Sequence, residues 1–153
     1  MKLPGTIERL LAAGITGASE GLFPQNDFGA PDHRDAEMLE RTRDYIDELP
    51  PQQGLMLVFL FVALELLAPF LLGMPRRFSR MTPTQRANAV RGWRRSRFFL
   101  LRVLGDAVKA STTMMYMSHP KVVAHIGEYR TCEALGEGFE VKPNALPIRE
   151  VLE

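Results

Sequence analysis

Side chains that could carry out acid–base or metal chemistry gather in one short stretch late in the chain. This stretch contains Tyr116, His119, His125, Tyr129 and Cys132. Imidazole and thiolate groups can bind metals or act as base and nucleophile, so an independent small enzyme that uses His119, His125 and Cys132 is one hypothesis. The spacing of His119 and His125 fits neither one face of a helix nor a common zinc pattern. We therefore favour structural roles for these groups and predict no catalytic, cofactor-binding or metal-binding residue in this chain.

Other catalytic motifs do not occur in the sequence. It contains no Gly-rich phosphate loop, no dinucleotide-binding fingerprint, no His-Glu-x-x-His helix and no nucleophile elbow around a serine. Because Cys132 is the single cysteine, an internal disulfide and any multi-cysteine zinc or iron–sulfur centre are excluded. We therefore looked for residues that could bind another molecule.

Arginine is concentrated in the middle of the chain. Residues 75–105 contain nine arginines and no acid, whereas residues 1–48 contain ten acids and five bases. The arginines are Arg76, Arg77, Arg80, Arg86, Arg91, Arg94, Arg95, Arg97 and Arg102. They either pair with the acidic N-terminal helices or face a partner. An Arg-rich protein that binds nucleic acid or a membrane surface is an alternative, although the net charge of +1 and the absence of lysine here disfavour nucleic acid.

The composition and punctuation of the chain predict one all-α domain. Its 153 residues are 46% hydrophobic and 24% charged, which is ordinary for a globular protein. Apolar residues recur at steps of three and four between proline and glycine breaks. We predict a compact domain of about five helices over residues 1–132, followed by an irregular, extended C-terminal arm over residues 133–153.

The first helix is expected to begin at a cap on Thr6 and to end near Leu22. Gly14 and Gly17 weaken its second half, because glycine is a poor helix former. A loop rich in turn formers follows and leads to the second helix.

The second helix is expected to begin at a cap on Asp32 and to end near Glu48. Its apolar face would lie on the core, as in an ordinary surface helix. A short helix over residues 121–126 should end at Gly127, in the usual C-terminal role of glycine.

The most apolar segment, Leu55 to Leu72, is long enough to cross a bilayer. Glu65 near its centre and Pro69 both disfavour a membrane span, because a charge there is costly and proline removes a backbone donor. We predict instead that this segment is the central helix of the domain, apolar on nearly every side and surrounded by the others.

The fourth helix has the clearest local signal. Thr82 can cap it, Pro83 suits its first position and Gln85 can complete a capping box. The pattern predicts a single helix that continues through Arg102, and the following segment to Met117 is also expected to be helical.

A helical wheel over residues 86–102 separates two faces. Trp93 falls on the face of the core, whereas Phe98 falls near Arg91 and Arg95 on the other half. Aromatic residues among arginines are typical of protein–protein interfaces. We therefore assign Trp93 to the core and Phe98 to a partner surface.

Short motifs spread over roughly residues 7–132 resemble those of a known family. They are Phe23-Pro24 with Asp27, Gly29-Ala30-Pro31-Asp32, Tyr45-Ile46-Asp47-Glu48-Leu49-Pro50, Arg77-Phe78-Ser79 to Trp93-Arg94-Arg95-Ser96-Arg97, and Tyr116-Met117-Ser118-His119-Pro120 to Ile126-Gly127-Tyr129. Together they resemble the gluconate 2-dehydrogenase subunit 3 family. The resemblance implies a non-catalytic small subunit that binds, stabilises or helps to mature a large FAD-dependent alcohol or sugar dehydrogenase or oxidase of the glucose–methanol–choline class.

The resemblance also implies a hetero-oligomer in which FAD belongs to the large subunit and this chain binds no cofactor. Combined with the arginine pattern, it gives a predicted partner surface of Arg91, Arg94, Arg95, Arg97, Phe98, Tyr116 and His119. Exported members of the family usually carry a twin-arginine signal on this subunit, and this sequence shows none at its start. We therefore expect a cytoplasmic protein with no membrane span, with co-export beside a partner as the alternative.

Overall fold

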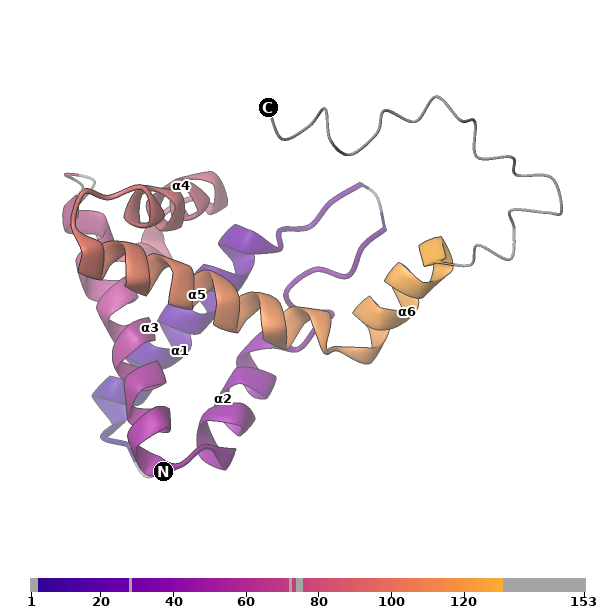
Figure 1. Ribbon diagram of the computed structural model, residues 1–153, viewed down its shortest axis with the longest axis horizontal. Coiled ribbons are helices and arrows are strands. Elements are labelled where there is room, and N and C mark those ends of the chain that lie inside the picture. Colours follow the sequence, from indigo (N-terminus) through magenta and orange to yellow (C-terminus); the bar gives the residue numbers. More distant parts are fainter. Residues whose placement is uncertain (1–2, 28, 72, 74–75, 131–153) are drawn as a thin grey trace, which may run out of the picture.

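The structure is a computed structural model that describes residues 3–27, 29–71, 73 and 76–130. These residues form six α-helices, one short 3-10 helix and no strand, which confirms the all-α prediction (Figure 1). The elements are α1 (Gly5–Leu22), α2 (Met38–Glu48), α3 (Pro51–Leu71), η1 (Phe78–Arg80), α4 (Pro83–Arg94), α5 (Phe99–Met117) and α6 (Pro120–Arg130). The predicted C-terminal arm, and with it the boundary of the domain, lies outside the described residues.

Helices α1 and α3 share the centre of the fold, because each contacts the other and also α2, η1, α4 and α5. Helix α1 makes the larger part of these contacts. It contacts α2, α3, η1, α4 and α5, and it buries Leu11, Ile15 and Ala18 in the main core. In Figure 1, α5 crosses the bundle, α4 lies at one end, and α6 extends away from the other helices. The central position predicted for α3 is therefore shared with α1.

Two glycines bring α1 close to its neighbours. A Cβ added at Gly14 would collide with the backbone carbonyl of Phe61 in α3, and one at Gly17 would lie 3.0 Å from the ring of Phe78 in η1. Although glycine lowers helix propensity, α1 continues unbroken through both glycines to Leu22 and ends at a cap on Phe23, near the predicted end. Tertiary packing at these two positions outweighs the low helix propensity of glycine.

One side of α3 is exposed along most of its length. Its inner side is buried, with Phe61 and Leu64 at most 1% exposed. Its outer side exposes Leu55, Met56, Phe59, Leu66 and Leu67. Within the described residues, α3 is also the one helix long and apolar enough to cross a membrane, and 44% of that apolar window is buried in the fold. Helix α3 contacts α1, α2, η1, α4 and α5, as expected of a central helix, but the described residues leave its outer side uncovered, so the expectation that it is surrounded on nearly every side is met only in part.

Glu65, which disfavoured a membrane span, is fully buried and hydrogen-bonded. Its carboxyl group accepts bonds from the backbone N–H (2.9 Å) and the hydroxyl (2.6 Å) of Ser79. Arg86 donates to the backbone oxygens of Phe78 (3.3 Å) and Ser79 (2.7 Å) and pairs with Glu20. This polar network joins α3, η1, α4 and α1, so it satisfies buried groups that would otherwise be costly.

The predicted helix caps have mixed outcomes. The capping box of Thr82 and Gln85 is present in full, with Pro83 as the first helical residue. Thr6 caps nothing, because α1 already begins at Gly5 after Pro4. At the other end of the described chain, α6 continues past Gly127 instead of ending there.

Asp32 caps a turn and not a helix. Its carboxylate accepts the backbone N–H groups of Arg34 (2.7 Å) and Asp35 (2.9 Å). Glu37 then adopts a left-handed backbone with φ 47°, which separates this turn from α2. For this reason α2 begins later than predicted, at Met38, although it ends at Glu48 as expected.

Candidate partner-binding surface

The predicted fourth helix is two helices joined by a turn. The N–H of Arg95 bonds to the oxygen of Arg91 and that of Ser96 to the oxygen of Trp93, which ends α4. The hydroxyl of Ser96 then accepts the N–H of Phe98 at 3.2 Å, just before α5 begins. A wheel drawn over residues 86–102 as one helix is therefore wrong beyond Arg94.

This turn is held in place by close packing of α5 on α4. A Cβ at Gly105 would lie 2.9 Å from the backbone nitrogen of Arg94 and 3.0 Å from the Cβ of Trp93. Nε of Arg94 also donates to Oδ1 of Asp106 at 2.6 Å. Trp93 is 2% exposed, so its predicted place in the core is confirmed.

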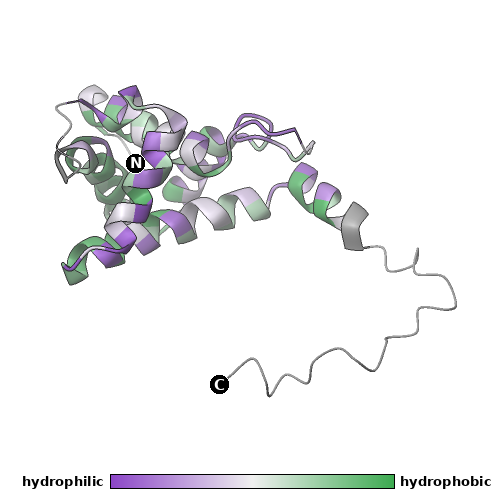
Figure 2. Cartoon of the chain, turned by 90° about the horizontal axis from the view of Figure 1, so that it is seen from above, coloured by the Kyte–Doolittle hydropathy of each residue, from purple (hydrophilic) through white to green (hydrophobic). Residues whose placement is uncertain are grey.

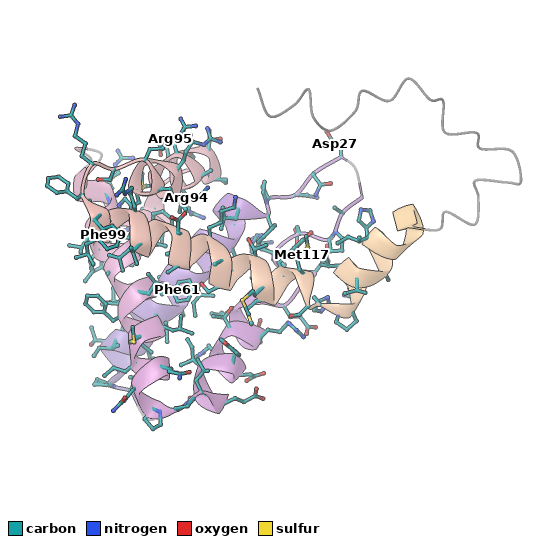
Figure 3. The ribbon with its side chains drawn as sticks, in the orientation of Figure 1. Asp27, Phe61, Arg94, Arg95, Phe99 and Met117 are labelled. Atoms are coloured by element: carbon teal, nitrogen blue, oxygen red, sulfur yellow. The ribbon has the colours of Figure 1, made fainter. Side chains whose placement is uncertain are left out.

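The turn exposes four apolar side chains at the start of α5, which we call the corner patch. Phe98 and Phe99 are each 71% exposed, Leu100 is 67% exposed and Val103 is 44% exposed. The guanidinium of Arg102 lies over the ring of Phe99, 5.9 Å from its centroid. In Figure 2 the start of α5 is hydrophobic and lies at the outer edge of the bundle, and Figure 3 shows Phe99 and Arg95 at this edge. Phe98 thus lies on the surface, as predicted.

Two of the nine arginines pair with acids of the chain itself. These are Arg86, which pairs with Glu20, and Arg94, which pairs with Asp106. No ion pair with a described acid forms at Arg76, Arg77, Arg80, Arg91, Arg95, Arg97 or Arg102. All seven of these side chains belong to exposed residues. The acidic N-terminal helices therefore neutralise only a small part of the arginine-rich segment.

Tyr116 and His119 lie inside the chain. The ring of Tyr116 stacks on that of Phe23, with centroids 3.8 Å apart, and its hydroxyl donates to the oxygen of Pro31 at 2.5 Å. His119 is 6% exposed, and its Nδ1 accepts the N–H of Lys121 at 3.2 Å. Both side chains are buried by other parts of this chain, and their contact with a partner stays a prediction.

Charge near this loop shifts two pKa values. Burial raises the pKa of Tyr116, and the negative charges of Asp32 and Asp35 raise it further. The pKa of Asp32 lies below its ordinary value, mainly because the carboxylate accepts the N–H of Asp35, with a further contribution from that of Arg34. Both groups take part in hydrogen bonds that hold this loop, Asp32 to the backbone of Arg34 and Asp35 and Tyr116 to the oxygen of Pro31.

The candidate enzymatic residues are only partly described. His119 lies at the break between α5 and α6, and His125 lies within α6. Among the residues that the structure describes, no group of three or more His, Cys, Asp or Glu side chains could hold a metal ion. Cys132 lies outside the described residues, so the independent-enzyme hypothesis remains as the sequence left it.

Sequence reasoning missed most of the exposed apolar surface. The wheel over residues 86–102, extended to Val103, also puts Phe99, Leu100 and Val103 on the half of Trp93, and this placement is wrong because the helix breaks before them and leaves them exposed. A second exposed group contains Met114 and Met117 on α5. They border a shallow hollow of about 580 Å³ that is also lined by Arg94, Asp106, Lys109, Ala110 and Thr113. Ser96, two residues before Phe98, is a weak local signal for the turn, and by itself it does not predict a break.

The corner patch is the strongest candidate surface in the described part of the chain. It combines exposed aromatic side chains with arginines that pair with no described acid, and the turn that presents them is shaped by the Ser96 hydrogen bond and by close packing at Gly105. Comparison of the chain with protein-family models, curated proteins and solved structures gives no match.

Proposed function

We propose that this chain is a non-catalytic small subunit that binds, stabilises or helps to mature a large FAD-dependent alcohol or sugar dehydrogenase or oxidase. The observation that carries a binding role is the corner patch, with exposed Phe98, Phe99, Leu100 and Val103. The flavoprotein class of the partner rests on the sequence motifs that resemble gluconate 2-dehydrogenase subunit 3. In this proposal FAD belongs to the partner, and the two chains form a cytoplasmic or co-exported hetero-oligomer.

The energy of apolar burial supports a partner. Burying a phenylalanine that is exposed in the free chain is worth about 1.5–3 kcal/mol. Phe98 and Phe99 together could therefore supply several kcal/mol to association, before the cost of ordering two molecules. Aromatic residues and arginine are also enriched where protein interfaces are strongest.

Purification of the tagged chain from its own cells tests this proposal. We expect a large polypeptide with a flavin absorption spectrum to elute with this chain in constant proportion, and to oxidise an alcohol or sugar. The proposal is refuted if the chain elutes as a monomer without flavin. Turnover by that monomer alone would instead support the independent-enzyme hypothesis.

A membrane-surface role is the second candidate. It is favoured by the exposed apolar side of α3, which includes Leu55, Met56 and Phe59, together with the unpaired arginines. Sedimentation with vesicles of phosphatidylcholine and phosphatidylserine tests it. Binding that disappears in vesicles of phosphatidylcholine alone would support this role.

A further inference from the structure

Seven arginines without a described acidic partner precede the corner patch or lie within the same stretch of chain. Together with the apolar patch they favour a binding partner that is both apolar and acidic. No acid occurs between Glu65 and Asp106 in the sequence. Asp106, the nearest acid along the chain, is already paired with Arg94. Within the part of the chain that the structure describes, the positive charge beside the corner patch is therefore not neutralised, and it can attract the acidic groups of another molecule.

The rigidity of the turn favours a preformed site on the partner. Ser96 bonds to the N–H of Phe98, and Gly105 allows α5 to lie directly on α4, so the two phenylalanines leave a fixed backbone. A rigid aromatic anchor binds a pocket with little loss of conformational freedom. Two phenylalanines on a defined backbone therefore fit a recess in a protein better than the same residues on a flexible tail would fit it.

The type of basic residue distinguishes a protein partner from a lipid surface. All nine basic residues between residues 75 and 105 are arginines, and none is a lysine. Anionic lipids attract both residues through charge, whereas the planar guanidinium of arginine binds a carboxylate through two parallel hydrogen bonds. The exclusive use of arginine therefore favours carboxylates on a protein.

A second copy of this chain is a poor occupant of the same surface. In a two-fold dimer built on the corner patch, the patch of one copy would face the patch of the other. Arg95, Arg97 and Arg102 would then approach their own equivalents without intervening acids. Like charges placed together in this way oppose association.

We propose that the corner patch inserts Phe98 and Phe99 into an apolar recess on the large partner subunit, and that carboxylates at the rim of this recess bind Arg95 and Arg97. This inference rests on the proposed function, because it names the contact surface of that same complex. It extends that function by predicting an acidic rim around an apolar pocket on the flavoprotein.

The test measures binding of full-length variants to the flavin-containing subunit isolated from the native complex. Phe98→Ala combined with Phe99→Ala should weaken the dissociation constant by about 30-fold or more. The matched control is Met56→Ala combined with Phe59→Ala on α3, since these side chains are similarly exposed, at 72% and 63%. The control should bind within about threefold of the unmodified chain. Equal weakening by both pairs, or weakening by the α3 pair alone, would overturn the assignment of the surface.

Charge variants test the acidic rim. Arg95→Glu with Arg97→Glu should abolish binding, and Arg95→Lys with Arg97→Lys should weaken it by about tenfold, because lysine keeps the charge but loses the paired hydrogen bonds. Full binding by the glutamate pair would overturn the inference. Normal binding of the flavoprotein by the double lysine variant would also overturn it. So would a double glutamate variant that loses binding to vesicles but still binds the flavoprotein. If no flavoprotein accompanies the unmodified chain, the proposed function fails. If the flavoprotein binds the unmodified chain and the variants equally well, only the inference about this surface fails.

Discussion

Replacing Gly14 with alanine should destabilise the protein, although alanine is the better helix former. In an open helix position this change gains about 1 kcal/mol. At Gly14 the new methyl group would meet the backbone carbonyl of Phe61, which cannot rotate away as a side chain can. Overpacking of a tight core costs about 1–3 kcal/mol or more, and a backbone contact lies at the upper end. We therefore expect a net loss of about 2 kcal/mol.

Gly92 provides a matched control on a different helix. A Cβ at Gly92 meets no atom within 4 Å, so Gly92→Ala should gain up to about 1 kcal/mol. The same chemical change is thus expected to have opposite signs at two positions. The difference isolates the close approach of α1 and α3 from the helix propensity of glycine.

Urea unfolding followed by far-ultraviolet circular dichroism measures both changes, and a thermal scan provides a second readout. At this chain length, about 1 kcal/mol corresponds to roughly 2–4 °C in melting temperature. Gly14→Ala should lower the melting temperature by about 4–8 °C, while Gly92→Ala should raise it by a few degrees. A Gly14→Ala protein as stable as the unmodified one would refute the packing of α1 against α3.

Three further changes test other parts of the fold. Ser79→Ala should cost about 1–3 kcal/mol in urea unfolding, because it leaves a carboxyl oxygen of buried Glu65 without its hydroxyl donor; an unchanged midpoint would contradict this network. Trp93→Ala should cost about 3–5 kcal/mol or prevent folding, and loss of partner binding with unchanged stability would contradict its core position. Because the pKa of Tyr116 is raised in the folded chain, the unfolded chain loses its proton first, and stability should fall as the pH rises above about 10. In Tyr116→Phe that part of the alkaline loss should disappear in pH-dependent unfolding; an identical slope would show that other groups cause it.

Local signals in the sequence predicted the features that depend on neighbouring residues. The all-α class and the capping box at Thr82 follow from periodicity and from a four-residue pattern, and both are confirmed. Trp93 was correctly assigned to the core because it lies within α4, where the wheel applies.

Features that depend on distant residues were missed. The break after Arg94 requires α5 to fold back onto α4 at Gly105, which no local pattern reveals. Tyr116 looked available to a partner, but Pro31, 85 residues earlier, accepts its hydroxyl hydrogen bond. Periodicity shows which face of a helix is apolar, and only the tertiary arrangement shows whether something covers it.

The central place of α1 has a consequence for synthesis of the chain. Helix α1 precedes α3 and α4 in the chain, and its apolar side is buried against both. At about 5–20 residues per second, the roughly 70 residues between Leu22 and Arg94 take on the order of 4–14 s to synthesise. During that interval the native neighbours of α1 are made one after another, first α2, then α3 and last α4, so its apolar side is fully covered only after α4 is complete.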